Sequence, residues 1–456
     1  MRAGNDAIAV VILAAGQGSR MLSELPKVLH KIGGVPMVGH AIAAARTLEP
    51  ERLIVVAGHG ADAVRKAVGA LDAEAQIALQ DQQLGTGHAV RQAMPALEGF
   101  EGRVIVLYGD TPFISPETLA ALRDHPADVV VLGFDAADPG RYGRLVTGPR
   151  GLERIVEYKD ADEATRAITL CNSGVLAADA AMLGALLGRL TNENAAGEYY
   201  LTDIPALARG EGASVDVVRC DEAETLGINT RAELAGAEAI FQASARRAAL
   251  DSGVTLTAPE TVYFALDTAI GRDAVIGPSV IFGPGVSVES GAEIAGFCHL
   301  EGCHIASGAT VGPFARLRPG AEIGGDAHIG NFVEVKNSVL AEGVKVGHLT
   351  YLGDADIGAH SNIGAGTVTC NYDGVMKHRT TIGEAAFIGS DTMLVAPVRI
   401  GARAMTGSGS VITQDVPDEA LGLGRAKQVN KPGLAARIMA ALRQTKAQKH
   451  QKKDQG

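Results

Sequence analysis

A glycine-rich segment near the start of the sequence carries residues suited to bind phosphate groups. Gly16 and Gly18 follow the apolar run Ile8–Leu13, and Arg20 and Lys27 come shortly after them. Because glycine lets the backbone approach a ligand closely, successive N–H groups in such a loop form a cradle for an anion. A plain turn between a strand and a helix would not need the two cations. The spacing matches neither the dinucleotide fingerprint nor a Walker loop, so it indicates a phosphate ligand without specifying the nucleotide.

Two more polar segments follow apolar runs in the first half of the chain. Residues 80–86 read Gln-Asp-Gln-Gln-Leu-Gly-Thr, and their carboxamides suit hydrogen bonds to the edge of a flat heterocycle. Asp110 comes just after the apolar run Val104–Leu107. A carboxylate at the carboxyl end of a parallel strand lies where open α/β sheets bind ligands, and Mg²⁺ is usually held by few protein oxygens together with phosphate oxygens. We predict that Asp110 is a ligand of Mg²⁺; the alternative is that it caps a helix.

A histidine in the second half of the chain is a candidate general base. His348 lies close in sequence to Tyr351, and Asn371 and Tyr372 come further along the chain. Imidazole, which titrates near neutral pH, is the natural group to remove a proton from an ammonium so that the amine nitrogen can attack a thioester. A lone histidine is more often a solvated turn residue, but these polar neighbours favour the catalytic interpretation.

The pairs Cys298-His299 and Cys303-His304 have a spacing that resembles a metal site. Neither pair is accompanied by a second ligand pair at the intervals usual for zinc. We therefore predict no zinc site there.

The elements that must position the first group of residues alternate along the chain. Strands are expected at Ile8–Leu13, Leu53–Ala57, Ile77–Leu79, Val104–Leu107 and Asp128–Gly133, and helices at Met37–Thr47, Asp62–Leu71, Thr86–Met94 and Pro116–Asp124. Such alternation predicts a mostly parallel sheet with helices on both faces.

A different period governs the chain from about residue 251 to residue 423. Aliphatic residues recur in steps of six or twelve, with slips of five at 300→305, 335→340 and 352→357; examples are Ile270, Ile276, Val288, Ile294, Leu300, Ile305, Val311, Leu317, Ile323, Ile329, Val335, Leu340, Val346, Leu352, Ile357, Ile363, Ile382, Ile388, Leu394, Ile400 and Ile412. This hexapeptide repeat predicts stacked coils that bury a thin aliphatic column, which also explains why aromatic residues are scarce. A generic glycine-rich all-β domain would not keep such a period.

A gap of 19 residues between Ile363 and Ile382 interrupts the repeat. We predict that residues 364–381 form a loop inserted into the coil, where a rigid scaffold can position functional side chains. Between the two halves, Thr230–Glu233 reads as a capping box that opens a helix ending near Asp251. The predicted domains are therefore residues 1–229, a linker helix at 230–250, and residues 251–456.

Composition restricts the class of protein further. The chain has 456 residues, 57 glycines, 46% hydrophobic residues and a net charge of −11, which argues against wholesale disorder and against a nucleic-acid binder. Five scattered cysteines suit a reducing compartment, and no apolar run approaches the ~20 residues that span a bilayer. Asp6 and the sequence after Ala15 argue against a signal peptide. We expect a cytoplasmic protein that binds no nucleic acid and no membrane.

Several motifs together give a specific resemblance. The segments around Gly16–Met21, Lys27, Gln83–His88, Tyr108–Asp110 and Glu198–Asp203 are similar to those of sugar-1-phosphate nucleotidylyltransferases. With the hexapeptide repeat and the segments around His348–Tyr351 and Asn371–Tyr372, almost the whole chain resembles the bifunctional bacterial enzymes that make UDP-N-acetylglucosamine. In these, a glucosamine-1-phosphate acetyltransferase is fused to an N-acetylglucosamine-1-phosphate uridyltransferase.

The resemblance implies a fold, substrates and an assembly. It implies an α/β Rossmann-like nucleotidyltransferase domain followed by an all-β left-handed parallel β-helix. Acetyl-CoA, glucosamine-1-phosphate and UTP would be the substrates, Mg²⁺ the cofactor, and a homotrimer the assembly.

The resemblance also implies roles for individual residues. In the first domain, uridine would be held by Leu13, Ala14, Gly16, Gln80, Gly85 and Thr86, the triphosphate by Arg20 and Lys27, and the sugar phosphate by Tyr108, Gly143, Glu157 and Asn172. Asp110 and Asn229 would ligate Mg²⁺. In the second domain His348 would be the base; glucosamine-1-phosphate would be held by Arg318, Lys336, Tyr351, Asn362 and Lys377, and acetyl-CoA by Ala365, Asn371, Tyr372, Ser390, Ser408 and Arg425.

Two other functions remain open from the residues alone. One is a nucleotidylyltransferase with a single activity whose β-helix is structural or regulatory, and the other is a scaffold without catalysis. The insertion and His348 discriminate between them and the two-reaction enzyme, because a purely structural coil has no use for either.

Overall fold

The structure is a computed structural model that describes residues 7–194 and 196–453. The chain forms two compact units, of which the first comprises Met1–Ile270 and Pro278–Val286 and the second Gly271–Gly277 and Ser287–Gly456. The residues at the very start of the predicted first domain lie outside the described part. The domain boundaries at 229/230 and 250/251 stay a prediction.

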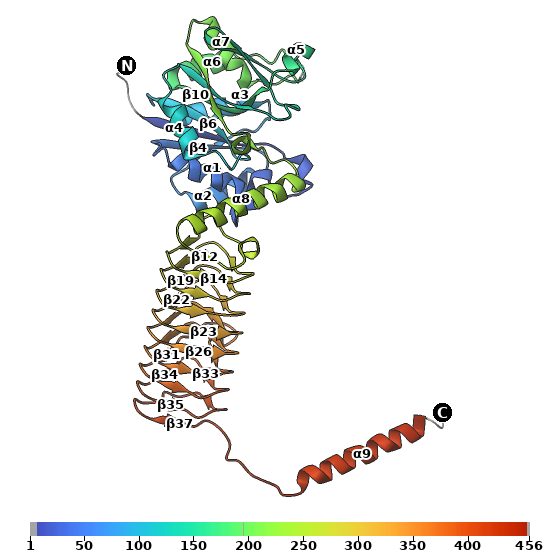
Figure 1. Ribbon diagram of the computed structural model, residues 1–456, viewed down its shortest axis with the longest axis vertical. Coiled ribbons are helices and arrows are strands. Elements are labelled where there is room, and N and C mark those ends of the chain that lie inside the picture. Colours follow the sequence, from blue (N-terminus) through green and yellow to red (C-terminus); the bar gives the residue numbers. More distant parts are fainter. Residues whose placement is uncertain (1–6, 195, 454–456) are drawn as a thin grey trace. The chain divides into compact units, whose positions relative to one another are not determined.

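The first unit is built on a mixed sheet (Figure 1). Its main path runs β11-β7-β10-β6-β1-β4-β5, and the strands are β1 (Ile8–Ala14), β4 (Arg52–Ala57), β5 (Gln76–Leu79), β6 (Arg103–Tyr108), β7 (Val129–Asp135), β10 (Leu170–Asp179) and β11 (Val215–Cys220). Strand β10 runs antiparallel to β6 and β7, whereas β6, β1, β4 and β5 are parallel. A hairpin of β8 (Arg144–Gly148) and β9 (Gly151–Val156) joins at the edge of β10.

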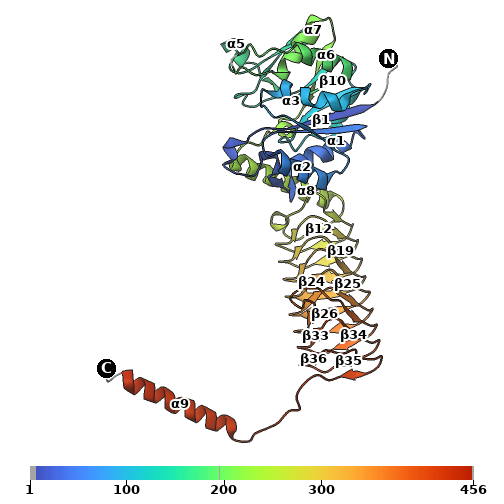
Figure 2. The same cartoon turned by 180° about the vertical axis from the view of Figure 1, so that it is seen from behind.

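Helices cover both faces of this sheet (Figures 1 and 2). The side chains of β1 alternate between two hydrophobic cores, one on each face of the sheet, because successive side chains of a strand point to opposite faces. Val11 and Leu13 pack with α3 (Thr86–Ala93), α6 (Ala180–Arg189) and α7 (Ile204–Gly210). Val10 and Ile12 pack with α1 (Met37–Arg46), α2 (Ala61–Leu71) and α4 (Pro116–Asp124).

The strands and helices expected in residues 8–133 are confirmed, with ends that shift by one or two residues. Alternation did not predict the elements between β7 and α8, among them the hairpin β8–β9, the short helix α5 (Glu163–Arg166), strand β10, α6, α7 and β11. The expected capping box is confirmed, because the Oγ1 of Thr230 accepts from the N–H of Glu233 and the carboxylate of Glu233 accepts from the N–H of Thr230. It opens α8 (Arg231–Asp251).

The second unit consists of short parallel strands stacked into three sheets, a parallel β-helix. One sheet contains β14 (Val275–Ile276), β17 (Glu293–Ile294), β20 (Thr310–Val311), β23 (His328–Asn331), β26 (Lys345–His348), β29 (Asn362–Ile363), β32 (Phe387–Ile388), β35 (Met405–Thr406) and β37 (Leu421–Gly422). The next contains β16 (Ser287–Val288), β19 (Cys303–Ile305), β22 (Ala321–Ile323), β25 (Ser338–Leu340), β28 (Ala355–Ile357), β31 (Thr380–Ile382) and β34 (Val398–Ile400). The third contains β18 (His299–Leu300), β21 (Arg316–Leu317), β24 (Glu334–Lys336), β27 (Tyr351–Gly353), β30 (Val368–Cys370), β33 (Met393–Val395) and β36 (Val411–Ile412).

The chain contains further short strands and one more helix. The first unit also contains β2 (Lys31–Ile32), β3 (Val35–Pro36), β12 (Thr255–Leu256), β13 (Ala269–Ile270) and β15 (Ile281–Phe282). The last helix is α9 (Leu434–Lys453). In the part of the chain that the structure describes, no helix combines the length and the apolar character needed to cross a membrane.

The inward positions predicted from the repeat are buried from Ile276 to Ile412, whereas Ile270 is partly exposed. The extent of the inserted loop was predicted wrongly. Strand β30 continues the coil through the predicted gap, with Thr369 buried at the inward position and paired with β33. A threonine fits there because its hydroxyl donates to the carbonyl of Gly353 at 3.0 Å and accepts from the N–H of the same residue at 2.7 Å. The loop outside the coil is therefore shorter, between β30 and β31.

Candidate functional sites

The predicted phosphate loop follows β1 at the carboxyl edge of the sheet. Ala14 ends the strand, Gly16 and Arg20 are exposed, and Gly18 has a φ of 62°. A Cβ atom on Gly18 would lie 2.5 Å from the Cβ of Lys27, so only glycine allows the lysine to pack against the loop. The loop and both predicted cations are thus at one edge, as phosphate binding requires.

Lys27 joins the two residues predicted to ligate Mg²⁺. Its ammonium forms a salt bridge with the carboxylate of Asp110 and donates to the Oδ1 of Asn229 at 3.0 Å. The Ile228 N–H donates to the Asp110 carbonyl at 3.1 Å, and the Asn229 N–H donates to Glu233 in the capping box of α8 at 2.6 Å. Asn229, which is 202 positions from Lys27 in sequence, therefore contacts the same lysine ammonium as Asp110.

This arrangement tests both interpretations of Asp110. The next helix after it is α4, whose N-cap is Ser115, so Asp110 caps no helix and that alternative is wrong. The oxygens of Asp110 and Asn229 converge on one ammonium, and oxygen donors are those that Mg²⁺ prefers. These two residues fit a divalent cation.

The predicted nucleoside residues line the neighbouring loops. Gln80 is buried, and its Nε2 donates to the carbonyl of Gly85 at 3.1 Å and contacts Nδ1 of His88 at 3.0 Å. Gly85 has a φ of 104°, and a Cβ there would lie 2.7 Å from the carbonyl of Tyr199. The Oγ1 of Thr86 accepts from the Leu201 N–H at 3.1 Å, which ties this loop to the segment 198–203.

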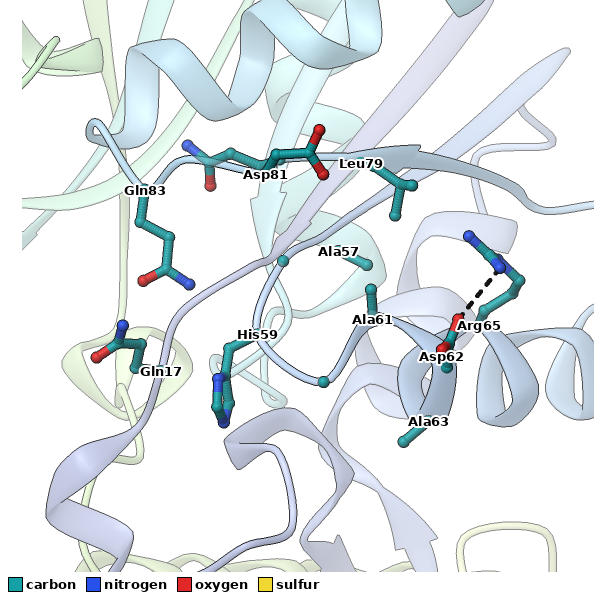
Figure 3. Close-up of a pocket in the computed structure, with 13 residues that line it drawn as sticks. Gln17, Ala57, His59, Ala61, Asp62, Ala63, Arg65, Leu79, Asp81 and Gln83 are labelled. Atoms are coloured by element: carbon teal, nitrogen blue, oxygen red, sulfur yellow. Dashed lines mark hydrogen bonds and ion pairs between the residues drawn. The ribbon is translucent and has the colours of Figure 1, made fainter.

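A cavity of about 580 Å³ borders Gln80. Figure 3 shows Gln17, His59 and Gln83 near one another on one side of it. Gln17 and Gln83 line it together with His59, which follows β4, and Gln83 donates to the carbonyl of Ala15 at 2.8 Å. The sequence motifs predicted no role for Gln17 or His59. Gly58-His59-Gly60 follows an expected strand just as the phosphate loop does, so the sequence could have predicted that His59 lies near the ligand.

The predicted sugar-phosphate residues come together from β6, the β8–β9 hairpin and β10. A Cβ on Gly143 would lie 3.6 Å from both the Oε1 of Glu157 and the Cβ of Asn172. The same Oε1 accepts from the hydroxyl of Thr202 at 3.1 Å. The ring of Tyr108 packs against Gly174, where a Cβ would lie 2.7 Å from it.

Burial shifts the pKa values of two of these groups. Loss of solvent raises the pKa of the Glu157 carboxyl, against a smaller lowering by Thr202. Burial also raises the pKa of the Tyr108 phenol, and the charge of Asp110 adds to that rise. Tyr108 is therefore a neutral hydrogen-bonding group, and Glu157 is a carboxyl whose charged form is penalised unless a ligand satisfies it.

Glu157→Gln should stabilise the first unit at pH 7 and impair its use of sugar phosphate. Because the pKa of this carboxyl is raised in the folded state, its contribution to stability is fully present below the unfolded pKa of 4.5, where the carboxyl is protonated. That contribution is lost as pH rises through the folded pKa. At pH 7 the free energy of unfolding of the variant should therefore exceed that of the wild type by about 1 kcal/mol, which raises its Tm by ~2–4 °C. This difference in stability should disappear near pH 4.5. The KM for N-acetylglucosamine-1-phosphate should rise about tenfold.

Calorimetry and steady-state kinetics of uridyl transfer measure both effects. Glu153→Gln, an exposed change on β9, the strand that Glu157 directly follows, is the matched control and should change neither. A gap that widens at acid pH would contradict the assigned sign.

In the second unit, His348 ends β26 and lies on the exposed surface. The Nδ1 of its imidazole is bonded to the Oδ1 of Asn331, the last residue of β23. Tyr351 begins β27 on the next face of the same turn. A Cβ on Gly353 would overlap the hydroxyl of Tyr351 and would lie 2.8 Å from the Nδ2 of Asn371, so these two predicted groups also meet.

Three predicted phosphate ligands form a cationic cluster on this face. Lys336 and Lys377 are close enough that the ammonium of Lys377 lowers the pKa of Lys336, with Arg318 adding to the effect. Arg318 itself donates to Glu334 at 2.8 Å. Adjacent ammonium groups repel one another, and a bound phosphate would relieve that repulsion.

The predicted acetyl-CoA residues follow one corner of the coil. The Asp391 N–H donates to Ala365, the Gly409 N–H donates to Ser390, and the guanidinium of Arg425 donates to the carbonyl of Ser408 at 2.7 Å. The Gly366 N–H donates to Leu349, which places His348 in the same column. Asn371 is buried and donates to Asp354 at 2.5 Å, whereas the Tyr372 ring is exposed and Asn362 lies beside Lys345 on the outer face of β29.

The cysteine–histidine pairs do not form a cluster. Cys298 and Cys303 are buried free thiols, and burial raises the pKa of Cys303 to about 12. Over the described ranges 7–194 and 196–453, no three His, Cys, Asp or Glu side chains are grouped to hold a metal ion.

Comparisons with known proteins agree with this two-unit architecture. The family of MobA-like NTP transferase domains matches residues 10–186, and the bacterial transferase hexapeptide family (six repeats) matches residues 379–414. The chain is 77% identical over 439 residues to "Bifunctional protein GlmU" of Paracoccus denitrificans, covering 96% of this chain and 98% of that protein. It is 66% identical over 444 residues to the protein of the same name from Cereibacter sphaeroides strain ATCC 17023 (97% and 98% covered) and 63% identical over 448 residues to that of Jannaschia sp. (98% and 99%).

These matches confirm the expected fold class. The first unit is a Rossmann-like nucleotidyltransferase unit, and the second is a left-handed parallel β-helix of hexapeptide repeats.

Proposed function

The chain belongs to the GlmU family of bifunctional proteins, and from this premise we propose how its residues divide two reactions. The protein is an enzyme with two activities, a glucosamine-1-phosphate acetyltransferase and an N-acetylglucosamine-1-phosphate uridyltransferase. The site residues, the metal ion, the assembly and the location are the proposed part.

The first unit would carry out uridyl transfer. The phosphate oxygen of N-acetylglucosamine-1-phosphate attacks the α-phosphorus of UTP, and the bond to the leaving pyrophosphate breaks. Such transfer needs positioning and neutralisation of charge more than an acid or a base. The N–H groups after Gly16, with Arg20 and Lys27, would hold the triphosphate, while Gly143, Glu157 and Asn172 would hold the sugar.

A divalent cation, proposed as Mg²⁺, would bind at Asp110 and Asn229, and when bound it supplies further positive charge beside the phosphates. Lys27 contacts the same two oxygens. Its ammonium therefore lies beside the proposed cation site, where it would also contact a phosphate.

The second unit would carry out acetyl transfer. His348 would take a proton from the amine of glucosamine-1-phosphate as its nitrogen attacks the thioester carbonyl of acetyl-CoA. The carbon–sulfur bond then breaks, and the CoA thiolate leaves and is protonated. Lys336, Lys377 and Arg318 would hold the sugar phosphate, and Asn371 and the corner at Ser390 would hold acetyl-CoA.

One observation carries this assignment: each unit has its own cluster of charged and polar side chains, Lys27–Asp110–Asn229 in the first and His348 with the cationic cluster in the second. A structural coil would need neither. The test supplies glucosamine-1-phosphate, acetyl-CoA and UTP together and follows free thiol and pyrophosphate separately. Both should appear. Pyrophosphate that requires added N-acetylglucosamine-1-phosphate, with no thiol, would reduce the protein to a single-activity nucleotidylyltransferase.

We also propose a homotrimer in the cytoplasm. Hexapeptide coils commonly need a partner surface, and this one exposes Phe387, Met405 and Leu421 along a single sheet. All five cysteines are free, as is usual in a reducing compartment. Sedimentation equilibrium of the full chain at three times the monomer mass supports the trimer, and a monomer at assay concentration contradicts it.

A further inference from the structure

Asn331 and His348 are direct neighbours across two coils of the second unit. They are cross-strand partners in the parallel pair β23–β26, and the Leu349 N–H donates to the Asn331 carbonyl at 3.0 Å. A Cβ on Gly330 would overlap the carbonyl of Gly347. The two backbones are therefore in close contact at the residues that directly precede Asn331 and His348. This packing leaves little freedom in the distance between the two side chains.

The bond between them determines which imidazole nitrogen is free. The Oδ1 of Asn331 is a carbonyl oxygen and can only accept, so the proton lies on the Nδ1 of His348. The Nε2 then has its lone pair available, on a side chain that is otherwise exposed. A general base needs that lone pair and a fixed ring orientation.

We propose that Asn331 is the positioning residue of the acetyl-transfer site, which holds His348 in the tautomer and orientation of a base with Nε2 directed at the amine. This inference rests on the proposed role of His348. Because a carboxamide is neutral, it orients the ring without placing a charge beside it.

A second histidine in the same sheet also has a cross-strand hydrogen bond, and it provides the matched control. The hydroxyl of Thr310 on β20 is bonded to the Nδ1 of His328 on β23 at 2.7 Å, again between cross-strand partners. Thr310→Ala removes a hydrogen bond of similar kind that involves no predicted site residue. It separates a specific effect of Asn331 from a general effect of such bonds on the coil.

The experiment compares Asn331→Ala, Asn331→Asp, Thr310→Ala and His348→Gln in the full-length enzyme. The readouts are kcat, KM and the pH profile of acetyl transfer, with uridyl transfer from supplied N-acetylglucosamine-1-phosphate as an internal test of folding. Asn331→Ala should lower kcat about 10- to 100-fold, as expected when a catalytic group loses its orientation, with KM for glucosamine-1-phosphate changed less than about threefold. Asn331→Asp should move the acidic limb of kcat/KM to higher pH by about one unit, because a carboxylate favours the imidazolium. Thr310→Ala should match the wild type.

The outcomes separate failure of this inference from failure of the proposed function. If His348→Gln abolishes acetyl transfer while Asn331→Ala keeps the wild-type kcat, Asn331 has no positioning role. An Asn331→Asp enzyme with an unshifted acidic limb, or a Thr310→Ala enzyme as slow as Asn331→Ala, also overturns the inference. If His348→Gln acetylates at the wild-type rate, the base itself is misassigned.

Discussion

Replacing His348 with alanine should slow acetyl transfer by about 10²- to 10⁴-fold, the usual range for a lost general base. The side chain is exposed at the end of β26, and its loss creates no cavity in the aliphatic column, so the protein should keep its fold. Uridyl transfer from supplied N-acetylglucosamine-1-phosphate should be unchanged. The acidic limb of the acetylation profile should flatten, because protonation of the imidazole is what disables the wild-type enzyme at low pH.

The measurement is kcat/KM against pH for the wild type, for His348→Ala and for His328→Ala. His328 is an exposed histidine of the same sheet that is bonded to Thr310, and its removal should leave the profile intact. If Tyr351 were the critical group and His348 only bonded the sugar, His348→Ala would keep the wild-type pH profile and mainly raise the KM for glucosamine-1-phosphate.

Asp110→Ala should abolish uridyl transfer, with a loss of at least about 10²- to 10³-fold, and should spare acetyl transfer. The change removes the only carboxylate that contacts Lys27, within the described residues, and leaves Asn229 as the single oxygen for a cation at that point. Asp110→Asn, which keeps the shape and removes the charge, should be similarly inactive. Excess divalent cation should not restore either variant.

Pyrophosphate release and thiol release measured on the same preparation test this prediction. Asp135→Ala is the control, because Asp135 is a carboxylate at the end of β7 in the same sheet and pairs with Arg219 on the surface at 2.8 Å. Loss of both activities in a folded Asp110→Ala protein would argue against independent sites, and retained uridyl transfer would remove Asp110 from the mechanism.

Apolar patterning predicted the scaffold of both units. Apolar runs that alternate with helical stretches gave the strands up to residue 133, and the hexapeptide period gave the inward column from Ile276 to Ile412. It failed where a polar residue takes an inward position, as Thr369 does by bonding its hydroxyl to the backbone of Gly353. It also gave no account of β8–β10, which carry Gly143, Glu157 and Asn172; those residues entered only through resemblance.

Contacts between distant residues were the least predictable feature of the sites. Lys27 and Asn229 are separated by 202 residues, and no local pattern brings them together. Asn331 and His348 are separated by 17 because the slip of five at 335→340 shortens that coil from 18 residues to 17. The slip was visible in the sequence, but which side chains it would join depends on the register of the stacked strands.

The most direct test of two complete and separate sites in one chain is to mix purified Asp110→Ala and His348→Ala proteins. Glucosamine-1-phosphate, acetyl-CoA and UTP are supplied, and UDP-N-acetylglucosamine is measured over time. Either variant alone should form the product at no more than about one hundredth of the wild-type rate. The mixture should form it much faster after a lag, since N-acetylglucosamine-1-phosphate released by one protein is used by the other. Product at the wild-type rate from either variant alone, or no gain from a mixture in which each protein keeps its own half-reaction, would contradict the account.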